Sequence, residues 1–90
     1  KIRIKTLLMK LRYFAWLKEI TKVDSEEIID ESIIDIKTLK LHICKKYPKL
    51  NLYFKKNSII RIAVNLEYTS SNKKIFSNDE IALFPPVSGG

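Results

Sequence analysis

The sequence predicts an α+β domain in which a mixed sheet of four to five strands packs on one main helix. Two observations carry this prediction. Short apolar runs with period-two alternation occur near both ends of the chain, and one long segment between them repeats apolar residues at helical spacing. A length of 90 residues suits a single domain with one core. Two packed layers accommodate this order of elements.

The first part of the chain predicts a strand, a short helix and a second strand. Leu11 and Tyr13 alternate with Lys10 and Arg12, which indicates a strand with one buried face. The next residues carry apolar side chains at helical spacing, and a polar turn then leads to another apolar pair. We predict a strand over residues 9–14, a short helix over 15–20 and a strand over 27–29.

The longest predicted element is a helix within residues 32–47. Its apolar stripe consists of Ile36, Leu39, Ile43 and Tyr47. Asp35 is a suitable N-cap, because a short carboxylate side chain can accept hydrogen bonds from the first-turn amides. Pro48 ends the helix, since the residue before a proline is pushed out of the α conformation.

The last part of the chain predicts strands separated by polar segments. We expect a loop or a short irregular piece over residues 50–58 and a strand over 59–66, with Ile60, Ile62, Val64 and Leu66 on one face. A polar turn over 67–72, a short edge strand over 74–76, a turn over 77–80 and a final strand over 81–84 follow. Asn78 tolerates positive φ in the last turn, and Phe84 is expected to point outward.

Composition and charge narrow the class of protein. The net charge of +7 permits attraction to acidic partners of several kinds, but the lysines are spread along the chain, which is typical of a solvated surface. The single cysteine, Cys44, excludes an internal disulfide and a multi-cysteine metal site. Apolar runs are too short to span a membrane. We expect a soluble, cytoplasmic protein with no metal, no membrane and no nucleic acid among its partners.

The end of the chain has an unusual composition. Its two glycines, Gly89 and Gly90, are the only glycines in the sequence, and Pro85-Pro86 stiffen the stem before them. A Gly-Gly end without Cβ atoms can pass through a passage too narrow for other side chains. We therefore divide the chain into an extension of unclear origin over residues 1–8, a domain over 9–84 and a protruding tail over 85–90.

Three motifs carry a resemblance to a known family. They are FPPVSGG at residues 84–90, AVN at 63–65 and NDEIALF at 78–84. Together they resemble the MoaD family, the small subunits of molybdopterin synthase. That family belongs to the ubiquitin-like β-grasp sulfur carriers, together with the thiamine carrier ThiS and ubiquitin-related modifiers. The resemblance covers all but the first eight residues and implies a ubiquitin-like β-grasp.

The resemblance also implies a reaction sequence. An E1-like, MoeB-like adenylyltransferase uses ATP to adenylate the Gly90 carboxylate, and a separate sulfur donor converts it to a thiocarboxylate. The tail of Pro85, Pro86, Val87, Ser88 and Gly89 then carries Gly90 into a MoaE-like large subunit, where sulfur passes to a cyclic pyranopterin precursor. The expected assembly is a heterotetramer. This chain would be the sulfur-donating subunit of a sulfurtransferase, with no active site and no stably bound cofactor of its own.

Docking residues are predicted at the base of the tail. Phe84 is the best candidate anchor, because it is an outward aromatic residue where the tail begins, although strand-end packing explains it equally well. Tyr68 and Lys18 are expected to flank it.

Other conspicuous residues have structural interpretations. We expect Trp16 to be a packing residue, His42 a surface residue without a carboxylate at metal spacing, and Cys44 apolar filler. The acidic residues at the start of the main helix (Asp30, Glu31 and Asp35) complement its positive end.

Two alternative functions stay open at this point. One keeps the thiocarboxylate but uses it for tRNA thiolation, thiamine synthesis or lysine conjugation. The other is a small basic nucleic-acid-binding module, which predicts aromatic residues among Lys and Arg on an exposed sheet face and leaves the Gly-Gly end unexplained.

Overall fold

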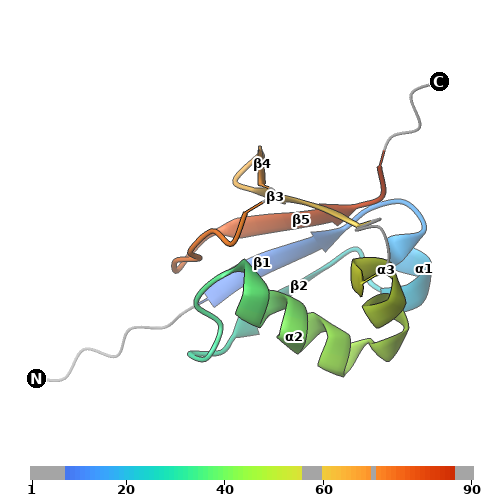
Figure 1. Ribbon diagram of the computed structural model, residues 1–90, viewed down its shortest axis with the longest axis horizontal. Helices are drawn as coiled ribbons and strands as arrows, with labels where there is room; N and C mark the ends of the chain where they lie inside the picture. The colour runs from blue at the N-terminus through green and yellow to red at the C-terminus, as the bar shows by residue number, and fades with distance from the viewer. Residues whose placement is uncertain (1–7, 56–59, 70, 87–90) are drawn as a thin grey trace, which may run out of the picture.

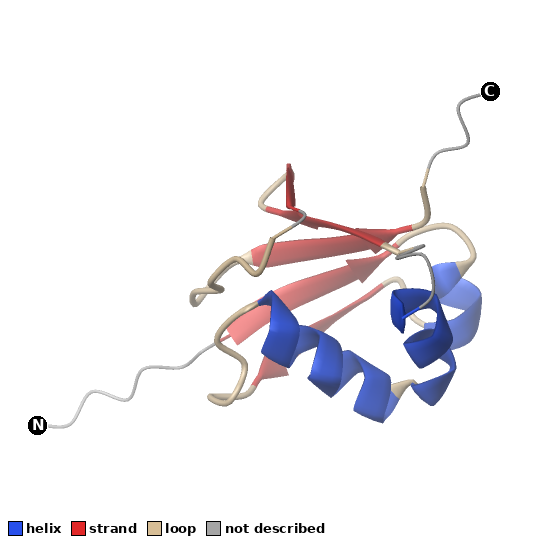
Figure 2. Ribbon diagram, viewed as in Figure 1, coloured by secondary structure: helices blue, strands red, loops and turns tan. Residues whose placement is uncertain are grey.

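The computed structural model describes residues 8–55, 60–69 and 71–86. In this part of the chain, a five-stranded sheet carries the helices on one side (Figure 1), and Figure 2 shows the helices in blue together below the red sheet. The elements are β1 (Leu8–Tyr13), α1 (Leu17–Thr21), β2 (Ser25–Ile29), α2 (Ile36–Lys46), the 3-10 turn η1 (Pro48–Leu50), α3 (Asn51–Lys55), β3 (Arg61–Val64), β4 (Glu67–Thr69) and β5 (Glu80–Phe84).

The strands lie in the order β2-β1-β5-β3-β4. β1 pairs antiparallel with β2 and parallel with β5, while β3 pairs antiparallel with both β5 and β4. The last strand of the chain is therefore held between two neighbours at the middle of the sheet. This mixed sheet on one main helix confirms the predicted α+β fold.

The core lies between the sheet and α2. Alternate strand residues and the predicted helical stripe meet there, as the period-two and helical patterns require. The fully buried side chains include Leu11, Leu39, Ile43, Ile81 and Leu83. The predictions that Ile81 and Leu83 face the core and that Asp35 precedes the main helix are confirmed.

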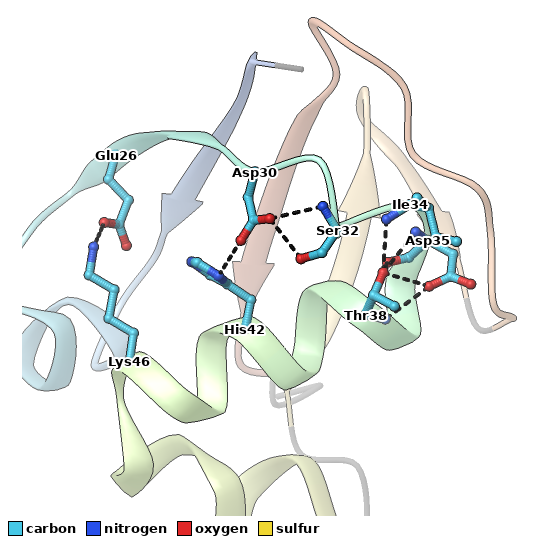
Figure 3. Close-up of polar contacts among 8 residues, drawn as sticks. All are labelled: Glu26, Asp30, Ser32, Ile34, Asp35, Thr38, His42 and Lys46. Carbon is cyan, nitrogen blue, oxygen red and sulfur yellow. Dashed lines mark hydrogen bonds and ion pairs between the residues drawn. The ribbon is translucent and has the colours of Figure 1, made fainter. Parts of the chain in front are cut away.

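Polar contacts fasten α2 along its length (Figure 3). At its start, Asp35 Oδ1 accepts a hydrogen bond from the Thr38 amide at 2.9 Å, and Thr38 Oγ1 accepts one from the Asp35 amide at 3.1 Å. At its end, Lys46 Nζ lies 2.6 Å from Glu26 Oε1 on β2. Such a reciprocal cap satisfies amides that a helix leaves without partners.

Glu26 is also the acceptor for two tyrosines. Its Oε2 accepts hydrogen bonds from the hydroxyls of Tyr13 at 2.5 Å and Tyr47 at 2.9 Å. Burial raises the pKa of this carboxyl, but hydrogen bonds from Lys46, Tyr13 and Tyr47 outweigh burial, so its pKa lies below the ordinary value. Glu26 therefore joins β1, β2 and the end of α2 through one charge.

One prediction about the middle of the chain was wrong. Residues 50–58 were expected to form a loop or a short irregular piece, but the chain continues from η1 into α3, and residues 56–59 lie outside the described residues. The helix is short and only partly buried, so it lacks the long apolar stripe by which a helix is recognised in a sequence. Its Tyr53 packs against Trp16 with ring centroids 4.9 Å apart, which agrees with a packing role for Trp16.

The β3–β4 hairpin corrects two further predictions. Residues 59–66 were predicted as one strand and 67–72 as a turn, but β3 ends at Val64 and β4 begins at Glu67. Asn65 and Leu66 form the turn with φ of 51° and 72°, and Leu66 is 94% exposed rather than on the core face. Positive φ at both central residues is typical of the type I′ turn of a two-residue hairpin, and the glycine that usually signals this turn is missing here.

The approach to β5 differs from the prediction at one point. Residues 74–76 do not form an edge strand; Lys74 makes an isolated bridge with Asp35, and the Ile75 amide donates to the Ile34 carbonyl at 2.9 Å. Asn78 has φ of 73°, which confirms that it supplies the positive-φ residue of the last turn.

Candidate functional site

The candidate site is the face of the sheet opposite the helices, which we call the open face. Because side chains alternate along each strand, residues between the core positions point to this face. The strand register aligns Phe84 with Arg61, and Ala82 with both Arg12 and Ala63. Ala63 in turn faces Tyr68 of β4.

Aromatic side chains gather on the open face where β5 ends. The rings of Tyr68 and Phe84 have centroids 5.4 Å apart with a tilt of 31° between their planes. Tyr68 is 78% exposed and Phe84 is half-buried, so the pair presents an apolar surface in which the less exposed Phe84 ring supports the Tyr68 ring. Exposed aromatic pairs of this kind are suited to anchoring a partner protein.

Phe14 adds a third ring at the same end of the sheet. The Phe14 amide donates to the Leu83 carbonyl at 3.0 Å, which holds Phe14 beside the end of β5. Arg12 lies on the open face with its guanidinium carbon 5.6 Å from the Phe14 ring centroid. The sequence signal for Phe14 was its place after Lys10 and Arg12 in the outward half of the alternation, but it was not identified as a site residue.

Charges surround these rings. Arg12 Nη1 forms an ion pair with Glu80 Oε2 at 3.0 Å. Arg61 is exposed beside Phe84, and its guanidinium makes no hydrogen bond or ion pair within the described residues. A positive group at the base of the tail favours a partner with an acidic rim.

The predicted docking residues are only partly brought together. Tyr68 and Phe84 are in contact, whereas Lys18 lies on α1, where its Nζ is 3.8 Å from Asp24 Oδ1. The docking role of all three stays a prediction.

The first two tail residues follow directly from this surface. Pro85 is half-buried and Pro86 is exposed after the end of β5. The other predicted tail residues, Val87, Ser88, Gly89 and Gly90, lie outside the described residues.

The other polar groups of the described residues have structural contacts. His42 was expected to be a surface residue with no Cys or carboxylate at metal spacing; it is half-buried, and Asp30 Oδ2 lies 3.4 Å from its Nδ1 (Figure 3). Burial raises the pKa of the Cys44 thiol, although Lys40 and Lys55 partly oppose this effect, so the reactive thiolate is disfavoured. Among residues 8–55, 60–69 and 71–86, no group of three His, Cys, Asp or Glu side chains could hold a metal ion.

The structure also bears on membrane association. Within the described part of the chain, no helix has the length and apolar character needed to cross a bilayer.

Comparison of the sequence with known proteins finds a matching family model and similar proteins. The model of the ThiS family matches residues 11–90. The chain is 43% identical over 88 residues to the molybdopterin synthase sulfur carrier subunit of Dictyostelium discoideum, and the alignment covers 90% of this chain and 94% of the relative.

Solved structures agree with this relationship. A putative molybdopterin converting factor subunit 1 from Pyrococcus furiosus superposes with a TM-score of 0.79 at 28% identity, covering 90% of this chain and 99% of that one. The small archaeal modifier protein 1 of Methanosarcina acetivorans gives a TM-score of 0.76 at 25% identity, covering 96% and 99%. These likenesses confirm the predicted ubiquitin-like β-grasp.

One solved neighbour was determined with a partner. It is a chain in the protein–protein complex of subunits 1 and 2 of the molybdopterin-converting factor from Helicobacter pylori, with a TM-score of 0.62 and 26% identity. The superposition covers 92% of this chain and 99% of that one.

Proposed function

Because the chain belongs to the ThiS family, we propose that it is the sulfur carrier subunit of a molybdopterin synthase. The observation that carries this proposal is the 43% identity to a subunit of that name over nearly the whole of both chains. The aromatic end of the open face supports it, since a carrier needs a surface that positions its tail against an enzyme.

The proposed chemistry centres on the Gly90 carboxylate. A carboxylate is a poor electrophile, so an activating enzyme first joins it to AMP from ATP and releases pyrophosphate. A sulfur nucleophile then attacks the acyl carbon, AMP leaves, and the thiocarboxylate remains. The thiocarboxylate sulfur bonds to a carbon of a cyclic pyranopterin precursor and displaces an oxygen leaving group. Water then hydrolyses the resulting thioester at the acyl carbon, which leaves the sulfur on the precursor and regenerates the Gly90 carboxylate. The acid and base groups for these steps belong to the partner enzymes.

The proposed division of labour fits what the described residues can do. His42 faces Asp30, and the high thiol pKa of Cys44 makes it a poor nucleophile. This chain supplies the reacting carboxyl group, and Pro85 and Pro86 restrict the direction in which the chain leaves β5.

The partner we propose for the open face is a large subunit of molybdopterin synthase. The complex of subunits 1 and 2 from Helicobacter pylori supports a partner of this kind. A heterotetramer and an E1-like activating enzyme belong to the same proposal, as does a cytoplasmic location, which suits a chain whose one cysteine is a free thiol.

A carrier that also conjugates to lysines is a second candidate. The specific observation in its favour is the superposition on small archaeal modifier protein 1. Both functions use an activated terminal carboxyl group, and they differ in whether sulfur or a lysine amine receives the acyl group.

The nucleic-acid alternative has one feature in its favour. It predicted aromatic residues among basic ones on an exposed sheet face, and Phe14, Tyr68 and Phe84 do lie near Arg12 and Arg61. A docking surface for a protein has the same composition. Membership of the ThiS family favours the protein partner.

The decisive experiment changes only the end of the chain. The protein is incubated with its activating enzyme, ATP and a sulfur donor, and its intact mass is measured. We expect the mass gain of one sulfur-for-oxygen exchange, which is lost when one alanine is appended after Gly90. Sulfur transfer by the extended protein would contradict the proposal, and a covalent adduct on lysine without sulfur gain would favour the modifier function.

A further inference from the structure

A groove lies between the first half of α2 and the start of β3, and we call it the α2–β3 groove. It is open, with a volume of about 880 Å³. Its apolar floor is formed by Ile36, Ile60 and Ile62, and its basic side chains are Lys37, Lys40 and Arg61. The groove reaches the base of the tail at Phe84 and Pro86. It is therefore continuous with the open face, because it shares Tyr68 and Phe84 with that face.

The charge of the α2–β3 groove has one sign. Three cationic side chains line it, and no carboxylate does so among the described residues. Lys37 and Arg61 are exposed and have no ion pair in the described part of the chain. Lys40 is half-buried, with its Nζ 5.6 Å from the ring centroid of Phe54. An occupant with negative charge is favoured by all three.

The helix terminus beside the groove is already satisfied. The Lys37 amide donates to Asn72 Oδ1 at 2.8 Å, and the Ile36 amide donates to the Lys73 carbonyl at 2.9 Å. Asp35 accepts from Thr38 in the same turn. Because these amides have acceptors, the anion-binding capacity of the groove resides in side-chain cations, which can contact carboxylates spaced along a chain.

We propose that the α2–β3 groove binds an acidic segment of the same protein that covers the open face, an inference that rests on the proposed function. Tyr68 and Phe84 line both surfaces, so a partner that covers the aromatic pair also reaches the groove. Carboxylates of the segment would face Lys37, Lys40 and Arg61, and its apolar side chains would lie over the isoleucine floor. Single-stranded nucleic acid is a poorer match, since it stacks its bases on accessible rings, whereas isoleucines form the floor of the groove and its two rings, Tyr68 and Phe84, are already in contact with each other.

The test is a binding titration with the large subunit of molybdopterin synthase from the same organism. The double variant Lys37→Glu/Arg61→Glu reverses two groove charges, and Lys45→Glu/Lys49→Glu makes the same change of net charge at the far end of α2. We expect the groove variant to weaken binding about tenfold or more and to flatten its salt dependence, whereas the control changes affinity by about twofold at most.

Further arms separate the possible outcomes. Circular dichroism reports whether a charge reversal disturbs the fold. If it does, the comparison is repeated with neutral side chains, in the groove variant Lys37→Gln/Arg61→Gln and the control variant Lys45→Gln/Lys49→Gln. Equal weakening by groove and control variants, or no weakening by either, would overturn the groove proposal and leave the proposed function intact. No binding by the unchanged protein would overturn both. Loss of binding to a mixed-sequence single-stranded oligonucleotide, with large-subunit binding unchanged, would assign the groove to nucleic acid instead.

Discussion

Phe84 has two properties that separate it from the other exposed aromatic residues. It is the last residue of β5, directly before the proline stem, and its ring rests on Tyr68. A ring that is held on one side and accessible on the other loses little freedom when a partner covers it. Under the proposed function, these two properties make Phe84 the expected anchor, placed where the tail begins.

Replacement of this anchor gives the first residue-scale prediction. Phe84→Ala should weaken binding to the large subunit by about 1 to 3 kcal/mol, as truncation of a buried aromatic anchor does. Isothermal titration calorimetry measures the change. Phe76→Ala is the matched control, because Phe76 is 63% exposed in the turn before β5, at the opposite end of that strand. Equal affinities of the Phe84 variant and the parent would remove Phe84 from the docking face.

Leu66 gives the second residue-scale prediction, one of stability. It has φ of 72° in the β3–β4 turn, and its side chain is 94% exposed, so it strains the backbone without packing. Leu66→Gly should raise the free energy of unfolding by about 1 kcal/mol, because glycine reaches this conformation without a Cβ clash. Urea unfolding measures it. Leu66→Ala keeps the Cβ and should show no such gain; a gain of equal size would mean that the leucine side chain, not the backbone, is responsible.

At the scale of elements, polar contacts fix both ends of α2, and its buried stripe packs in the core against the sheet. The cap formed by Asp35 and Thr38 fixes its start, and the cluster of Glu26, Tyr47 and Lys46 fixes its end against β2. The groove and the open face depend on this placement, since α2 forms one wall of the former and leaves the latter uncovered.

The Glu26 cluster predicts a pH dependence of this attachment. The folded-state pKa of Glu26 is lowered, so its contribution to stability is present above its ordinary pKa of 4.5 and is lost as pH falls below that value. Glu26→Gln should cost about 1 to 3 kcal/mol at neutral pH, because hydrogen bonds to a charged acceptor are the stronger kind. Urea unfolding across acid and neutral pH should show the gap between variant and parent closing in acid.

Glu27→Gln is the control for this measurement. Glu27 is the next residue of β2 and is exposed on the other face of the strand. Its substitution should leave stability unchanged at both pH values. If the difference in free energy of unfolding between Glu26→Gln and the parent persists unchanged in acid, the side chain acts by its shape and not by its charge.

At the scale of the whole molecule, the sequence predicts the architecture better than the docking surface. The main helix, its Asp35 cap and the inward residues of β5 follow from local periodicity and capping chemistry. The β3–β4 hairpin does not, because Asn65-Leu66 adopts a turn that usually has glycine. The contact of Glu26 with Tyr13 and Tyr47 also cannot be predicted from local patterns, because only the tertiary fold brings these residues together.

The site divides in the same way. Phe84 could be identified from its place at the end of β5, and Tyr68 from its place after the predicted strand over residues 59–66. Phe14 joins them only through the parallel pairing of β1 with β5. Arg61 reaches the same area through the antiparallel register that sets it opposite Phe84. Register is a property of strand pairing, so a single strand read alone does not reveal these neighbours.

The central place of β5 has a mechanical consequence. Its end leads to the tail, and both of its edges are hydrogen-bonded, to β1 on one side and β3 on the other. Tension applied along the axis of β5 loads both ladders in shear, so the hydrogen bonds of two ladders share the force, whereas an edge strand would have only one ladder to resist it. An enzyme can therefore draw the end of this chain deep into itself while the domain behind it stays folded.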